Sequence, residues 1–362
     1  MFKKERISGG QAAFFVTAAA IGTIFLVIPA SVVEEGGRDG WMAVPIGYAV
    51  GLLIALSLVK LGQRFPEKNI VQYLPDILGT VLGKIIGLVY IASFYFFSAV
   101  LIRQYAEVLL LLMPETPPIA FIFLLMLVVA YSVKAGLEVF ARTCQFFIIW
   151  VVLGLLALIL LSINVMDLNN FKPFLENGFK PVIKVIPMQI AFAAEAALFM
   201  ALWLPCLNKI QKGYRASIIG ISTAGVLMTL VVVSTVGVFG PDRVLNVVFP
   251  MFSMSRLIVL GDFLRGFEGI LLLIWIPASF MKVTIFFYPG VVGLAQWLNL
   301  NEYKPLVLPM AVIAAGLSMI PENMEQLTQV STFNDLYFIL PLALSIPLLW
   351  LIATIRRLDE SN

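Results

Sequence analysis

Residues 18–29 read AAAIGTIFLVIP and place small residues, Gly22 and Pro29 in the middle of a long apolar run. Glycine destabilises the interior of a helix, and proline removes a backbone donor and clashes with the preceding turn. In a membrane, non-helical backbone is tolerated only where protein or a polar cavity covers it. The stretch therefore predicts a membrane helix that is interrupted near its middle and buried in a larger bundle.

A second stretch of this kind lies in the other half of the chain. Residues 191–197 read AFAAEAA and surround one carboxylate, Glu195, with alanines. Taken alone, either stretch is better explained by small residues that let helices pack closely. Interrupted helices at matching positions of two halves indicate a transporter fold built from inverted repeats, with a site near the membrane midplane. The two stretches together favour this second interpretation.

The composition excludes several classes of protein. Of the 362 residues, 61% are hydrophobic and 12% are charged, whereas soluble domains have about 45–50% and about 25%. The chain contains no histidine, which removes histidine-based acid–base chemistry and most zinc and haem sites. Cys144 and Cys206 lie far apart and form no C-x-x-C motif, so we expect no metal and no cofactor. The basic residues are scattered, so we expect no nucleic acid partner.

Ten apolar runs approach the length of about 20 residues that a transmembrane helix needs. They are residues 8–34, 41–62, 84–113, 118–134, 138–163, 182–207, 214–238, 262–291, 305–320 and 332–356. We expect an all-α polytopic membrane protein with ten transmembrane helices, of which the first and sixth are broken. It would form a single domain over residues 1–362, with five-helix repeats over about 8–163 and 182–356.

The segments between these runs indicate the orientation. Residues 63–83 mix apolar and polar residues, which predicts a short amphipathic helix along the inner membrane surface. Lysine and arginine are concentrated on the same side, for example at 209–215 and 356–357. Cytoplasmic loops carry such an excess of positive charge. Both termini are therefore expected in the cytoplasm.

The motifs resemble those of a known superfamily. Gly22-Thr23-Ile24-Phe25 followed by Pro29 resembles the Gly-x-Gly-Ile-Phe break in helix 1 of the amino acid–polyamine–organocation superfamily, with Thr23 replacing the second glycine. Residues 191–195 are similar to its Phe-x-Gly-Phe-Glu motif on helix 6, with alanine replacing the glycine. Ten spans and the stretch IPASVVEEGGRDGW at 28–41 narrow the resemblance to the spore germination permease family, the B subunit of nutrient germinant receptors.

The resemblance implies a fold, a location and partners. The fold would be a LeuT-like 5+5 inverted repeat in the inner membrane of the spore, in contact with membrane lipid. The partners would be an A subunit with membrane spans and a C subunit that is a lipoprotein. The role would be to sense a small nutrient such as an amino acid, a sugar or a nucleoside. The residues themselves indicate a buried small-molecule site in a permease-like fold.

Ionisable residues at membrane depth are rare and are functional candidates. Arg103 and Glu107 are spaced i, i+4 and lie toward the outer end of the third run, which favours a structural ion pair. Glu195 lies deeper in the membrane, and two roles are open for it. It would either accept hydrogen bonds from freed backbone N–H groups, which is a structural role, or bind a proton or the ammonium group of a ligand. Lys282 would either partner Glu195 or extend toward the inner surface.

A pocket for a small zwitterion needs exposed backbone N–H and carbonyl groups and apolar or aromatic walls. The interrupted helices would supply the backbone groups, and the third and eighth helices would supply the walls. Most aromatic residues in membrane helices serve only for packing. The aromatic residues of the expected pocket are candidates for ligand binding only because of the resemblance. The expected ligand-binding residues are Gly22, Thr23, Ile24, Tyr95, Ala99, Glu195, Phe199, Thr284 and Tyr288.

Three functions are compatible with the sequence. No phosphate-binding, dinucleotide, serine-hydrolase or zinc-protease motif occurs, so an enzyme is not expected. We expect a germinant-sensing receptor subunit that binds a nutrient and signals to its partners. The alternatives are a cation-coupled amino acid transporter, for which the hydroxyls of Ser279 and Thr284 are poorly placed, and a passive channel subunit, for which no continuous polar stripe is present.

Overall fold

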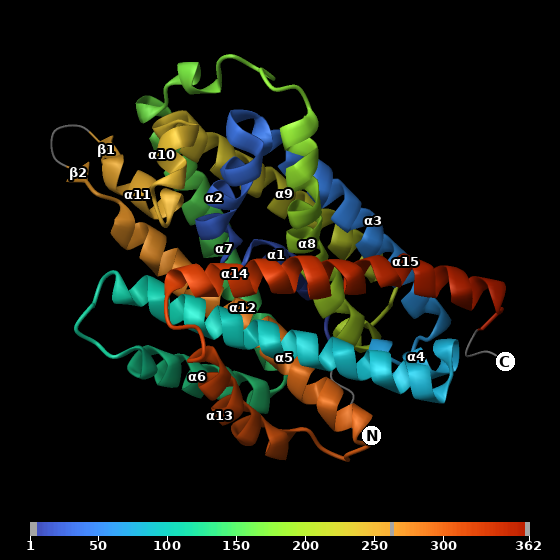
Figure 1. Cartoon of the computed structure of the whole chain (residues 1–362). Coiled ribbons are helices and arrows are strands. Elements are labelled where there is room, and N and C mark those ends of the chain that lie inside the picture. The colour runs from blue at the N-terminus through green and yellow to red at the C-terminus, as the bar shows by residue number, and fades with distance from the viewer. Residues whose placement is uncertain (1–5, 261–263, 359–362) are drawn as a thin grey trace.

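The computed structural model describes residues 6–260 and 264–358, and helices make up nearly all of this part (Figure 1). Residues 262 and 263, at the start of the eighth expected run, lie outside it. The first half of the chain contains α1 (Gly9–Ile21), α2 (Ile24–Gly36), α3 (Ala43–Arg64), α4 (Ile70–Leu78), α5 (Thr80–Leu110), α6 (Pro118–Ala135) and α7 (Leu137–Ser162).

The second half begins after a connection that holds two short 3₁₀ turns. It contains α8 (Lys180–Trp203), α9 (Lys212–Phe239), α10 (Pro241–Leu245), α11 (Pro250–Leu257), the antiparallel pair β1 (Val259–Leu260) and β2 (Leu264–Arg265), α12 (Glu268–Trp297), α13 (Val307–Ser318), α14 (Met324–Asn334) and α15 (Leu340–Ile355). A π-helical turn, Asp335–Ile339, joins α14 to α15.

The helices fall on the ten expected runs. Within the described residues, eight helices are long and apolar enough to cross a membrane, and Gly9–Ile21 and Lys304–Ser318 are shorter apolar helices. One of the eight, Ile24–Arg64, joins α2 and α3 through a 3₁₀ turn. In the numbering of the ten expected spans, α1 and α2 together form the first span, and α14 and α15 together form the tenth. The all-α prediction is confirmed.

The expected break in the first span is confirmed. α1 ends at Ile21, and α2 begins at Ile24. Gly22 has φ +38°, a backbone conformation that side chains disfavour. The Tyr48 hydroxyl donates to the carbonyl of Ala20 at 3.0 Å, which satisfies one of the carbonyls that the break exposes.

The expected break in the sixth span is not found. α8 runs as continuous α-helix through residues 191–197 to Trp203, and a 3₁₀ turn follows at Leu204–Cys206. Alanine has the highest helix propensity of all residues, so a run of alanines supports a helix. The small residues serve packing instead, since a Cβ at Gly47 or Gly51 of α3 would overlap Gln189 or Ala193 of α8.

The short amphipathic helix expected within 63–83 is confirmed as α4. The Asn69 side chain caps it by accepting from the backbone N–H of Gln72 at 3.3 Å. Its own residues Ile70, Tyr73 and Leu74 are buried against the rest of the protein. Which side of the membrane α4 lies on remains a prediction.

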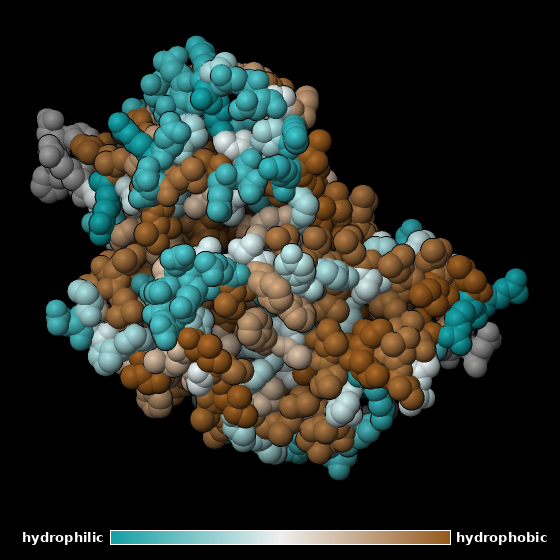
Figure 2. All heavy atoms as spheres, in the orientation of Figure 1, coloured by the Kyte–Doolittle hydropathy of each residue, from teal (hydrophilic) through white to brown (hydrophobic). Residues whose placement is uncertain are grey.

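The surface has the distribution of a membrane protein. Figure 2 shows hydrophobic residues over the middle of the visible face and hydrophilic residues gathered at its top, over the connection between α7 and α8. Large apolar side chains such as Leu53, Phe123 and Ile355 are exposed. Hydrocarbon can cover such side chains, whereas water would disfavour their exposure.

Candidate functional site

A fully buried lysine lies at the break in the first span. Lys282 of α12 donates from Nζ to the carbonyl of Ala19 at 2.8 Å and forms an ion pair with Glu195 of α8. Its methylene chain passes so close to Gly22 that a Cβ there would overlap it. The side chain of Lys282 therefore joins the first, sixth and eighth spans at one point.

A second buried carboxylate belongs to the same region. Asp335 begins the π-helical turn between α14 and α15 and is 2% exposed. It interacts electrostatically with Glu195 and Lys282. Its hydrogen bond comes from the neighbouring Asn334 amide, at 3.4 Å, and among the described residues it has no ion-pair partner. Two carboxyl groups and one amine therefore lie together in this buried cluster.

Asp335 lines a cavity of about 600 Å³. The cavity lies between α2, α5, α8 and α14, where Val27, Gln104, Phe192 and Ser331 line it. Beside it, the Thr23 hydroxyl at the helix break donates to the Gln104 amide oxygen at 3.0 Å. The cavity thus combines apolar walls with a few polar groups and one buried carboxylate, which is the usual composition of a small-molecule site.

Other residues that line the cavity are charged and exposed. Glu35 and Lys184 line it and form an ion pair of 3.3 Å, with both side chains 58% exposed. A pair as exposed as this contributes little to stability. The cavity is therefore lined both by exposed charged side chains and by the buried carboxyl group of Asp335.

The structure brings some of the expected site residues together. Gly22, Glu195 and Thr23 lie at the break and around Lys282, and Ile24 is buried at the start of α2. Ala99 is buried on α5. Lys282 partners Glu195, which is one of the two roles considered for it.

The other expected site residues have different neighbours. The Tyr95 hydroxyl donates to the carbonyl of Met310 on α13. Tyr288 packs against Tyr303, with ring centroids 5.9 Å apart, and Phe199 packs edge-on against Phe15 at 5.5 Å. The Thr284 hydroxyl donates to the carbonyl of Phe280 at 2.8 Å. None of the nine expected residues lines the cavity, so their role in binding stays a prediction.

Sequence analysis missed Asp335 and Gln104. Asn334 and Asp335 interrupt the last apolar run and are followed by Pro341 at the start of α15, so a polar break in that span could have been noticed. The proximity of Asp335 to Glu195 is a tertiary feature that no spacing in the chain reveals.

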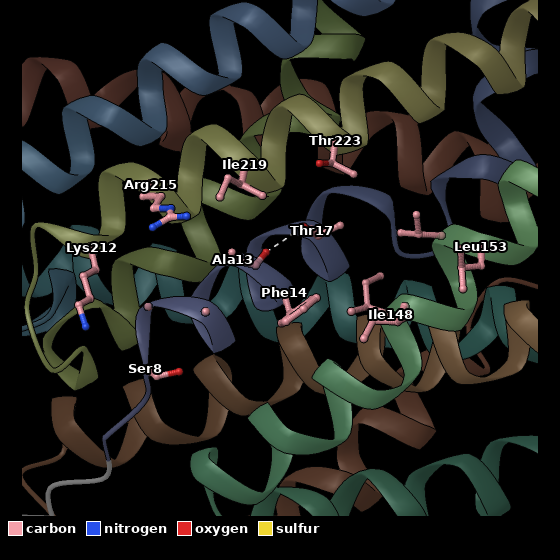
Figure 3. Close-up of a pocket in the computed structure, with 14 residues that line it drawn as sticks. Ser8, Ala13, Phe14, Thr17, Ile148, Leu153, Lys212, Arg215, Ile219 and Thr223 are labelled. Atoms are coloured by element: carbon pink, nitrogen blue, oxygen red, sulfur yellow. Dashed lines mark hydrogen bonds between the residues drawn. The ribbon is translucent and has the colours of Figure 1, made fainter.

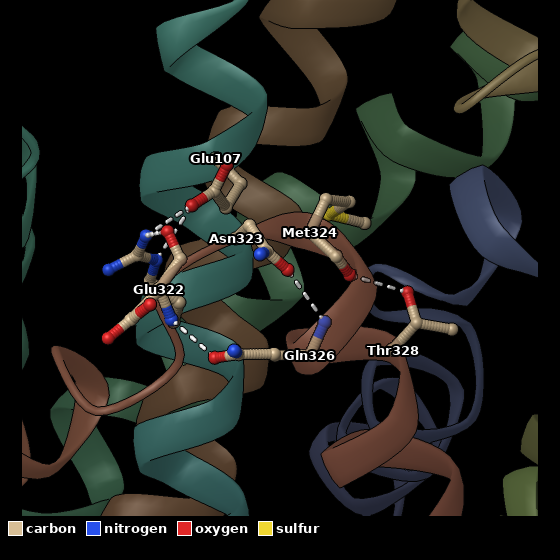
Figure 4. Close-up of polar contacts among 7 residues, drawn as sticks. Glu107, Glu322, Asn323, Met324, Gln326 and Thr328 are labelled. Atoms are coloured by element: carbon tan, nitrogen blue, oxygen red, sulfur yellow. Dashed lines mark hydrogen bonds and ion pairs between the residues drawn. The ribbon is translucent and has the colours of Figure 1, made fainter.

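Arg103 and Glu107 pair across one turn of α5 (Figure 4). The Arg103 Nε donates to Glu107 Oε1 at 2.8 Å, and Nη2 donates to the carbonyl of Glu322 at 3.2 Å. Asn323 then caps α14 by accepting from the backbone N–H of Gln326 at 2.9 Å. Through Arg103, the pair therefore attaches α5 to the segment that precedes α14, one of the helices that line the cavity.

A further cavity, of about 650 Å³, lies between α1, α7 and α9 (Figure 3). None of the expected ligand-binding residues lines it.

The fold is similar to that of solved transporters. MhsT in complex with L-phenylalanine superposes with a TM-score of 0.69 at 14% identity, covering 98% of this chain and 96% of that chain. A Na⁺-coupled sialic acid symporter in a substrate-bound outward-open state gives 0.67 at 12% identity, covering 94% and 78%. These likenesses confirm the LeuT-like fold.

Curated relatives of similar length are spore germination proteins. Spore germination protein KB of Bacillus subtilis (strain 168) is 29% identical over 370 residues, which is 99% of this chain and 98% of that protein. Spore germination protein YndE of the same organism is 26% identical over 328 residues, or 88% of each chain. The family model described as "Spore germination protein" matches residues 6–327. The chain is therefore a multi-pass, permease-like membrane protein that belongs to the spore germination protein family.

Proposed function

We propose that the chain is the nutrient-sensing subunit of a spore germinant receptor and binds a small nutrient that carries an ammonium group. Asp335 is the observation that carries this proposal. It is a buried carboxyl group that lines a cavity of about 600 Å³ and has no ion-pair partner among the described residues. A cationic group of the ligand would give this carboxyl group the ion-pair partner that an ionised side chain needs at membrane depth.

The remaining groups suit an amino acid. The Asp335 carboxylate would accept from the ammonium, and Phe192 and Val27 would contact an apolar side chain. The backbone N–H groups at the start of α2, at Thr23 and Ile24, would face the ligand carboxylate, because the first N–H groups of a helix have no partner within it. MhsT, which has a similar fold, was solved with L-phenylalanine bound, and this supports an amino acid in the present fold.

The arrangement favours sensing over transport coupled to an inorganic cation. The Lys282 ammonium already occupies the space between the Ala19 carbonyl and Glu195, where a coupling cation would otherwise find oxygen ligands. Binding of an ammonium group at Asp335 would bring a positive charge beside this pair and shift the equilibrium between conformations of the four spans that meet there. An A subunit and a lipoprotein C subunit would detect the shift at the inner membrane of the spore, with both termini of the chain in the cytoplasm.

The experiment compares ligands that differ only in the ammonium group. The purified protein in nanodiscs is heated with each of the common L-amino acids, or with the matching 2-hydroxy acids such as L-lactate and 3-phenyllactate. We expect at least one amino acid to raise the unfolding temperature, and its hydroxy acid to have no effect. Asp335→Asn should abolish the shift, whereas Asp242→Asn, a change of the same kind at an exposed carboxylate, should preserve it.

The results separate the candidate functions. A shift that survives in Asp335→Asn, or hydroxy acids that bind as well as amino acids, would overturn the ammonium site. Uptake into proteoliposomes that requires an ion gradient would establish the transporter instead of the receptor. Passive conductance without a bound ligand would establish the channel.

A further inference from the structure

The cavity between α1, α7 and α9 has one basic end and one apolar end (Figure 3). Lys212 and Arg215 lie at the start of α9. Phe14 of α1 and Ile148 and Leu153 of α7 form the wall that leads away from them. The volume of about 650 Å³ accommodates a chain of many carbon atoms.

The two basic side chains are available to a ligand. Both are exposed, and neither forms an ion pair with a carboxylate among the described residues. Gly9 lets Lys212 lie across the start of α1, since a Cβ at that position would come within 2.8 Å of the Lys212 Cδ. Two cations one helical turn apart match the charge and spread of a phosphate group.

The apolar wall is also available. Leu153 is 52% exposed and Ile219 is 44% exposed, although both lie in helices that are apolar enough to span a membrane. In the bilayer, hydrocarbon must cover these side chains. A phosphate bound at Lys212 and Arg215 would place its attached chains next to them.

We propose that this cavity binds one anionic phospholipid, with its phosphate at Lys212 and Arg215 and an acyl chain along Phe14, Ile148 and Leu153. Basic pockets between membrane helices recognise the head groups of such lipids. A zwitterionic phospholipid would bring its own ammonium group close to the two basic side chains, and a free phosphate would leave the apolar wall without a partner. The lipid would also contact Ala13 and Thr17 of α1, the half-helix that ends at the Gly22 break.

The lipid should therefore stabilise α1 against α7 and α9. Amide hydrogen exchange of residues 9–21 is compared in nanodiscs of phosphatidylcholine alone and in nanodiscs of phosphatidylcholine mixed with phosphatidylglycerol. We expect slower exchange in the mixture. Native mass spectrometry of the protein released from the mixture should retain one phosphatidylglycerol. Glycerol 3-phosphate added to neutral nanodiscs tests the phosphate without its chains, and we expect it to give no protection.

Two variants and a control make the result specific. Lys212→Gln with Arg215→Gln should weaken retention of phosphatidylglycerol by about tenfold. Ile219→Trp, which fills the cavity and keeps both charges, should weaken it as well. Lys134→Gln with Arg142→Gln removes two basic residues outside the cavity and should have no effect. Equal retention by the double variant and by the control, or equal protection by neutral and anionic lipid, would overturn the proposal. Protection by glycerol 3-phosphate without lipid chains would overturn the lipid site and indicate a site for the phosphate group alone.

Discussion

The stretches around Gly22 and Glu195 look alike in sequence but fold differently. Both contain small residues in an apolar run, yet α1 ends before Gly22, whereas α8 continues past Glu195. The first stretch contains a glycine that adopts φ +38°, and the second contains alanines, which favour the helix. Small residues therefore permit close packing in both places, but only the glycine allows the chain to leave the helical conformation.

The two stretches depend on each other through Lys282. Its side chain occupies the space that the absent Cβ of Gly22 leaves open, and its ammonium pairs with Glu195. The break in the first span and the continuity of the sixth are thus parts of one arrangement. The sixth span supplies a side chain to a site where the first span supplies backbone.

The largest effect is expected from breaking the pair. Glu195→Gln removes the carboxylate that is hydrogen-bonded to the buried Lys282 ammonium and should destabilise the protein by about 3–5 kcal/mol. The same loss is expected for Lys282→Met, which leaves the carboxylate. The double variant should lose less than the sum of the two, because neither charge is then left alone. The measurement is thermal unfolding in detergent, and strictly additive losses would show that the pair is not formed.

A smaller effect is expected from Gly22→Ala. An alanine at this position must adopt the positive φ of Gly22, which costs about 1–2 kcal/mol. Its Cβ must also displace the methylene chain of Lys282. We expect a loss of about 2–3 kcal/mol in unfolding free energy. Gly269→Ala, at an α12 glycine where a Cβ meets nothing within 4 Å, is the control and should change little. Equal stability of the two variants would mean that Gly22 is not constrained as described.

Much of the fold could be predicted from the sequence because hydrophobic length and glycine act locally. The ten spans, the break at Gly22 and the amphipathic α4 depend on such local properties. The continuity of α8 was missed because a resemblance to a broken helix was preferred to the helix propensity of alanine.

The candidate site was less predictable. Its central contacts join residues that are distant in the chain, such as Lys282 with Glu195, and Thr23 with Gln104. Tyr95 and Tyr288 were expected at the site because of the helices that carry them. The direction in which each side chain leaves its helix determines its contacts. Tyr95 donates to α13, and Tyr288 packs on Tyr303. Asp335 depends on a π-helical turn, which has no dependable sequence pattern.

The smallest effect is expected from a change in α8, the stretch that stays helical. Ala194→Gly introduces into α8 the residue type that accompanies the break in the first span. If glycine alone were sufficient to break a helix here, residues 191–197 would become irregular and amide hydrogen exchange would increase over the whole stretch. We expect a loss of only about 1 kcal/mol, the ordinary difference in helix propensity between alanine and glycine, with exchange unchanged beyond Glu195. The reason is that α8 is held on both sides of this position, by Ala193 against Gly51 and by Glu195 with Lys282. A loss several times larger, or rapid exchange throughout the stretch, would show that the sixth span is close to breaking and that alanine alone prevents it.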